Sequence, residues 1–144
     1  EYYNAHLIES HYVPLGNDFI LHPNQFVLGI TLEWIHFPKD LAGYVIGRSS
    51  WGRQGLIIAT ATGVHPGFSG CLVLELSNSG EVPIHIYPGL RIAQLFVHRL
   101  ETEEYQFDDI ELSCEGQAKP AIYSPISKKE EEIIKSISEQ NKRE

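Results

Sequence analysis

The segment GCLVLELSNSGEVPIHI, residues 70–86, decides the fold class of this chain. Residues 70–77 form an apolar run of strand length, and a second short apolar run covers residues 82–86. Between them, residues 78–80 (Asn-Ser-Gly) are a turn signal, because glycine accepts positive φ without a steric clash. Two such runs separated by a turn signal indicate strands rather than a helix.

The same pattern continues outward over most of the chain. Short apolar runs separated by Gly, Pro and Asn recur from residue 13 to about residue 112, with no helical period between them. Many short strands at this spacing are typical of a β-sandwich or barrel. We therefore predict an all-β domain over residues 1–124, with strands near residues 26–32, 42–46, 56–62, 70–77, 82–86 and 91–100.

The last 20 residues have a different pattern. Ser127 and Glu130 form a capping box, and four isoleucines recur at helical spacing: Ile126, Ile133, Ile134 and Ile137. This predicts a helix over residues 128–141, within a C-terminal segment 125–144 that packs on the domain, pairs with a partner or leads into a further domain. Because methionine is absent even at position 1, we expect the chain to be a domain of a longer protein.

Composition excludes several classes of protein. Of the 144 residues, 42% are hydrophobic and 21% are charged, which fits a globular domain and excludes wholesale disorder. No apolar run approaches the roughly 20 residues of a membrane-spanning helix, and no signal peptide is visible. The formal net charge of −8 lies wholly in the first 124 residues, with 14 acidic residues against six basic ones. Such an acidic body argues against nucleic-acid binding.

The cysteines and histidines indicate neither a disulfide framework nor a metal site. The two cysteines form no CxxC pair, and the seven histidines show no paired ligand spacing. Two thiols without a disulfide pattern fit a reducing compartment, so we expect a cytoplasmic protein that holds no metal through its own side chains.

The segment GRSSWGR, residues 47–53, is the first candidate for chemistry. It places two arginines and two serines within seven residues, and the planar guanidinium group matches phosphate oxygens. Taken alone, the segment is explained as well by an ordinary strand-to-helix turn with solvated arginines.

Three further features are ambiguous from residue type alone. Alternation along residues 72–77 places Glu75 opposite to the leucines, either as a solvated side chain or as a partly buried carboxylate suited to general acid–base work. The glycine-rich loop at residues 60–70 allows either a tight hairpin or close backbone approach to a ligand. Gln94 interrupts an apolar strand, where a buried amide would need hydrogen-bond partners.

Taken together, these motifs resemble the family that joins dCTP deaminases and trimeric dUTPases. The similar stretches are GRSSWGRQGL (47–56), HPGFSGCLVLELSNSGEVPI (65–84) and YPGLRIAQL (87–95), and FILHPNQFVLGITLE (19–33) resembles the family's preceding strand pair. The resemblance covers about residues 13–117. It implies a distorted jelly-roll barrel of the β-clip, dUTPase-like type, a homotrimer with active sites between subunits, and zinc-independent deamination of dCTP to dUTP with Mg²⁺ on the phosphates.

The resemblance also implies roles for individual residues. Arg48 and Ser50 would contact the triphosphate, while Ser49 and Arg53 would orient the attacking water and the carboxylate. Glu75 would take a proton from that water as it attacks cytosine C4, and then help to protonate the departing ammonia. The remaining nucleotide-binding positions implied by the resemblance are Thr62, Gly63, Gln94, Tyr105 and Gln117.

The chain departs from the family pattern in the loop that reads the pyrimidine edge. The loop over residues 59–65 is one residue shorter than expected, and His65 stands where the family has an aspartate. This departure keeps two alternatives open beside the deaminase. One is a dUTP pyrophosphatase. The other is a nucleotide-binding or trimerisation module that has lost catalysis.

Overall fold

The computed structural model describes residues 9–59, 63–101 and 132–133. The chain divides into two compact units, one of His11–Pro120 and one of Glu1–Ser10 with Ala121–Glu144. In the latter unit Glu132 and Ile133 are helical, and the rest of the helix predicted over residues 128–141 lies outside the described residues. Among the described residues, no helix is long and apolar enough to cross a membrane.

The described part of the unit His11–Pro120 is built almost entirely of strands, which confirms the all-β prediction. Its elements in chain order are β1 (Phe19–Leu21), β2 (Phe26–His36), β3 (Leu41–Gly47), α1 (Ser49–Gly52), β4 (Leu56–Ile58), β5 (Gly63–Val64), β6 (Ser69–Asn78), β7 (Ile84–Ile86) and β8 (Ala93–Arg99). Strand β6 and the turn after it correspond to the segment that decided the fold class.

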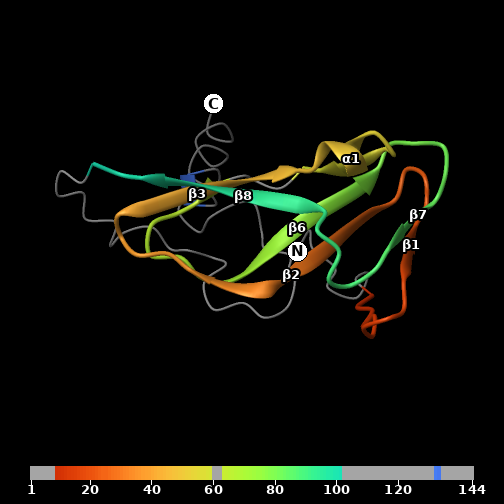
Figure 1. The fold of residues 1–144 in the computed structure, drawn as a ribbon, viewed down its shortest axis with the longest axis horizontal. Coiled ribbons are helices and arrows are strands. Elements are labelled where there is room, and N and C mark those ends of the chain that lie inside the picture. The colour runs from red at the N-terminus through yellow and green to blue at the C-terminus, as the bar shows by residue number, and fades with distance from the viewer. Residues whose placement is uncertain (1–8, 60–62, 102–131, 134–144) are drawn as a thin grey trace, which may run out of the picture. The chain divides into compact units, whose positions relative to one another are not determined.

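The strands form three antiparallel sheets. One sheet has the order β2-β6-β4 and another the order β5-β3-β8, while β1 and β7 form a two-stranded ribbon at one end of the longer strands (Figure 1). Within the described residues these sheets stay separate and no closed barrel is formed, so the jelly-roll barrel stays a prediction. Among the described strands, no paired strands are consecutive in the chain, so each antiparallel pair is joined by a crossover and not by a hairpin.

Strand β2 ends at His36, four residues beyond its predicted end at residue 32, and a bulge interrupts its pairing with β6. Its register against β6 shifts between Ile30 and Trp34. At the bulge the Thr31 hydroxyl accepts a hydrogen bond from the Leu72 amide at 2.9 Å and donates one to the Glu33 carbonyl at 3.0 Å. The side chain thus replaces missing ladder bonds, and pairing resumes at Trp34.

The inward side chains of both three-stranded sheets meet in one apolar core. It includes Val45 from β3, Leu56 from β4, Leu74 and Leu76 from β6, and Trp51 of α1 packs against it. Burial of these alternating positions is what the period-2 pattern of residues 70–77 predicts.

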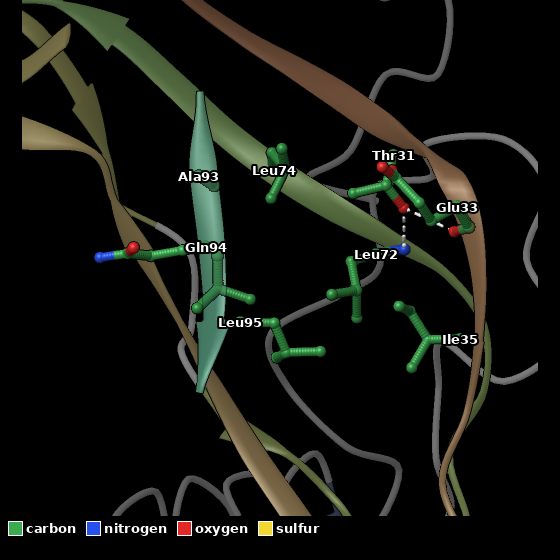
Figure 2. A pocket seen from close by; sticks show the side chains of 9 residues that line it. Thr31, Glu33, Ile35, Leu72, Leu74, Ala93, Gln94 and Leu95 are labelled. Atoms are coloured by element: carbon green, nitrogen blue, oxygen red, sulfur yellow. Dashed lines mark hydrogen bonds between the residues drawn. The ribbon is translucent and has the colours of Figure 1, made fainter. Parts of the chain in front are cut away.

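Between the two sheets lies a cavity of about 210 Å³. Figure 2 shows Ile35, Leu72, Leu74 and Leu95 around it, with Thr31 at its side and engaged in the bulge. Its lining is mainly aliphatic, and Glu75 does not line it because alternation turns that side chain to the other face of β6. The cavity is partly open to solvent, and its mainly aliphatic lining does not bring the predicted catalytic residues together.

Candidate active site

The turn that follows β3, residues 48–53 and called here the arginine turn, carries four of the predicted site residues. Arg48 caps α1 in an extended conformation, and its amide donates to the Ile92 carbonyl at 2.9 Å. Its guanidinium Nη1 also donates to the Arg91 carbonyl at 3.2 Å. These two bonds fasten the start of the turn to the segment before β8, so that Ser49 and Ser50 enter the exposed first turn of α1. The strand-to-helix turn expected from the sequence is therefore present.

The two arginines of this turn present their charge to solvent. Arg48 and Arg53 are exposed, and within the described residues neither forms an ion pair with a carboxylate. A guanidinium group without an acidic partner keeps its donors available for phosphate oxygens. The exposed guanidinium groups thus fit both a solvated turn and a phosphate-binding segment.

Gln94 lies beside this turn but is exposed, so the expectation of a buried amide was wrong. In the register of β3 and β8, Gln94 pairs with Ile46 and Ala93 pairs with Gly47, the residue before Arg48. Figure 2 shows the Gln94 side chain pointing away from the cavity between the sheets. Strand alternation turns its side chain outward, so its amide faces solvent.

Glu75 occupies the middle of β6, on the opposite sheet. It pairs with Leu28 of β2, and its carbonyl accepts a hydrogen bond from the Ala59 amide at 2.9 Å. The side chain is half-buried, whereas its strand neighbours Leu74 and Leu76 are buried. The alternation predicted from sequence is confirmed, and the carboxylate is neither fully solvated nor enclosed.

One protomer does not bring Glu75 and the arginine turn together. Glu75 lies beside Ala59, whereas Gly55, at the start of β4, accepts a bond from the Ser79 amide. Four residues of strand separate these two positions, which is about 13 Å at roughly 3.3 Å per residue. Arg53 precedes Gly55 in the chain, and no ion pair or hydrogen bond joins it to Glu75 within the described residues.

The remaining predicted site residues are placed only in part. Gly63 lies in β5, is exposed and pairs with Tyr44. His65 is also exposed, and its carbonyl accepts a bond from the Phe68 amide in the turn that Gly67 closes at a φ of +80°. Thr62, Tyr105 and Gln117 lie outside the described residues. No group of three or more potential metal ligands occurs in the part of the chain that the structure describes.

Sequence reasoning missed the apolar surface around Glu75. By register, the side of the β2-β6-β4 sheet that carries Glu75, called here the Glu75 face, also presents Phe26, Leu28, Ile30, Trp34, Ile57 and Val73. Phe26 is 58% exposed, Trp34 56% and Ile57 46%. The sequence did contain a signal for this surface, the run FVLGI at residues 26–30. It is apolar at every position and not only at alternate ones, which is typical of strands covered on both faces.

Comparisons with known proteins show the family of the chain. The family model described as dCTP deaminase-like matches residues 2–100. A protein of Mycobacterium avium (strain 104) named "dCTP deaminase, dUMP-forming" is 52% identical over 86 residues, which cover 59% of this chain and 45% of that protein. A protein of Methanobrevibacter smithii with the same name is 46% identical over 99 residues, or 68% of this chain and 51% of that protein. The chain thus spans about half the length of these relatives.

Solved structures show the same fold. Native EIAV dUTPase superposes with a TM-score of 0.53 at 25% identity, covering 64% of this chain and 76% of that one. A 2′-deoxycytidine 5′-triphosphate deaminase from Agrobacterium tumefaciens superposes with a TM-score of 0.55 at 22% identity, covering 62% of this chain and 28% of that one. The second likeness concerns the fold alone. From the family match, the chain belongs to the dCTP deaminase-like family.

Proposed function

We propose that the protein deaminates dCTP and hydrolyses the triphosphate, so that it releases dUMP, diphosphate and ammonia. The observation that carries this proposal is the placement of Glu75, a half-buried carboxylate on a mainly apolar sheet face. Such surroundings suit a group that exchanges protons with a bound water rather than with bulk solvent. The family and the printed name of the relatives support the substrate class.

The product expected from the sequence, dUTP, is corrected by the comparisons. The curated relatives are named dUMP-forming, so the expected deamination and the alternative pyrophosphatase become two parts of one reaction. Two waters are consumed. One replaces the amino group at cytosine C4, and the other attacks the α-phosphorus and breaks its bond to the bridging oxygen of the diphosphate. Mg²⁺ enters with the triphosphate as part of the substrate.

The side chains would divide the work as follows. Arg48 and Ser50 bind phosphate oxygens, while Ser49 and Arg53 hold the attacking water and the carboxylate in line with C4. Glu75 takes a proton from the water as the carbon–oxygen bond forms, and transfers it to the amino nitrogen as the carbon–nitrogen bond breaks. A group acting as both base and acid in this way contributes about 10²-fold to 10⁴-fold to the rate.

The separation of Glu75 from Arg53 favours a site shared between subunits of a homotrimer. The backbone beside Glu75 and the backbone at Gly55, which follows the arginine turn, lie about 13 Å apart along β4. The Glu75 face offers the apolar and aromatic centre that a stable subunit interface needs. We propose that this face meets the arginine turn of a neighbouring copy in a trimer of jelly-roll barrels.

The test of the reaction is product analysis. The purified protein with dCTP and Mg²⁺ should release ammonia and diphosphate in equal amounts and leave dUMP, and Glu75→Gln should lower the rate by about 10²-fold to 10⁴-fold. Ammonia release with dUTP as the end product would refute the second hydrolysis. Nucleotide binding without any ammonia would instead support a module that has lost catalysis, the alternative favoured by His65 at the aspartate position.

A further inference from the structure

Asn78 lies at the end of β6, three residues after Glu75, and is enclosed by backbone groups. It is 1% exposed and is the only buried polar residue among those described. Its Nδ2 donates to the Leu21 carbonyl at 3.0 Å and to the Val82 carbonyl at 2.9 Å, while its Oδ1 accepts from the Gly80 amide at 2.9 Å. Both donor hydrogens and one acceptor site are thus satisfied, which fixes the carboxamide in one orientation.

The turn that Asn78 organises touches the end of the arginine turn. The Ser79 amide donates to the Gly55 carbonyl at 2.9 Å. A Cβ added to Gly55 would lie 2.6 Å from the Gly80 amide nitrogen, and one added to Gly80 would lie 3.1 Å from the Gln54 carbonyl oxygen. The two turns therefore pack backbone against backbone, and Gly80 can approach so closely because it has no side chain.

Helix α1 is consequently fastened at two separate points. Its start is held by the bonds from Arg48 to the Ile92 and Arg91 carbonyls. Its end continues through turn bonds, including Gly55 amide to Gly52 carbonyl at 3.0 Å, into the contact with Gly80. A disturbance at Gly80 should therefore move the end of α1, which carries Arg53, more than its start, which carries Arg48.

From these contacts we infer that Asn78 is a positioning residue, whose carboxamide holds the turn at Gly80 against Gly55 and so places Arg53 for the reaction. The inference rests on the proposed function for the role of Arg53, but the mechanical coupling is a property of the described residues. It predicts an uneven effect. Turnover depends on the contact between Gly55 and Gly80, called here the junction, whereas the affinity for the triphosphate, held near Arg48, does not.

The fluorescence of Trp51 reports on the junction and can be measured without enzymatic activity. It lies in α1, is half-buried and packs against the core, and the chain has one other tryptophan, Trp34. In a Trp34→Phe background, Gly80→Ala should shift the Trp51 emission to longer wavelength and increase its quenching by acrylamide. Asn78→Ala should do the same. Ser79→Ala, a change at an exposed side chain of the same turn, is the matched control and should leave both signals unchanged.

Steady-state kinetics test the catalytic consequence. A methyl group on Gly80 should lower kcat about tenfold and leave KM for dCTP within about twofold, because small misplacements of reacting groups slow a step strongly. Gly80 is not among the glycines with positive φ, so the methyl group acts through its contacts with the Gln54 carbonyl oxygen and Asn78 Oδ1 and not through backbone strain. Calorimetry in a Glu75→Gln background should show unchanged binding stoichiometry, which separates misplacement from a loss of folded protein.

The outcomes distinguish this inference from the proposed function. An unchanged Trp51 emission in Gly80→Ala, or a KM that rises as much as kcat falls, would overturn the positioning role. Absence of ammonia release from the parent protein would reject the proposed function, and Trp51 emission alone would then decide whether the junction holds α1. If Asn78→Ala does not fold, Gly80→Ala still carries both measurements.

Discussion

Replacing Asn78 by alanine should destabilise the protein by about 3 kcal/mol. The substitution removes three side-chain hydrogen bonds, to the Leu21 and Val82 carbonyls and from the Gly80 amide. Each such bond contributes about 1 kcal/mol net, and the loss is larger where the abandoned backbone group is buried. For a domain of this size the change corresponds to a lower melting temperature by roughly 10 °C.

Urea denaturation at fixed protomer concentration, followed by far-UV circular dichroism, measures this effect. The fixed concentration matters because association of subunits adds to apparent stability. Ser79→Ala, in which an exposed side chain is shortened, should change the free energy of unfolding by no more than about 0.5 kcal/mol. A loss below about 1 kcal/mol for Asn78→Ala would mean that the carboxamide bonds contribute almost nothing to stability, contrary to this prediction.

Further substitutions test the packing, the exposed apolar face and a surface pair. Gly43→Ala should destabilise by about 2–4 kcal/mol, seen as a lower melting temperature, because the new Cβ would lie 2.7 Å from the Phe96 carbonyl oxygen. Trp34→Glu should lower the oligomeric state measured by light scattering, since a charge would enter the apolar centre of the proposed interface; a mass that does not change would contradict this use of the face. His85→Ala, which breaks the pair with Asp18, should cost no more than about 1 kcal/mol, because the His85 side chain is 55% exposed.

Much of the sheet structure could be predicted because the residues that form it carry a strong period-2 pattern. Residues 70–77 alternate as predicted, with Leu74 and Leu76 buried and Glu75 turned away from them. The bulge in β2 was not predictable, since it depends on Thr31 bonding to Leu72, 41 residues away. Strand β5 was missed because two residues, Gly63 and Val64, are too short a run to show any period.

The candidate site could be predicted as a set of residue types but not as a geometry. The arginine turn was visible as Arg48 to Arg53, and its strand-to-helix form is confirmed. The distance along β4 between Glu75 and Arg53 depends on which strands pair, and so required the structure. Gln94 was misjudged as buried because apolar neighbours in sequence do not reveal which face of a strand will be covered.

The central claim is that Glu75 of one subunit acts with Arg53 of another, and mixed oligomers test it most directly. Glu75→Gln and Arg53→Ala proteins, each inactive alone, would be co-expressed in equal amounts with different tags and the doubly tagged oligomers assayed with dCTP. In every trimer that carries both tags, about a third of the shared sites would combine an intact Glu75 with an intact Arg53. We predict recovery of about that fraction of the parent activity. Mixed oligomers that remain as inactive as either variant would contradict the claim.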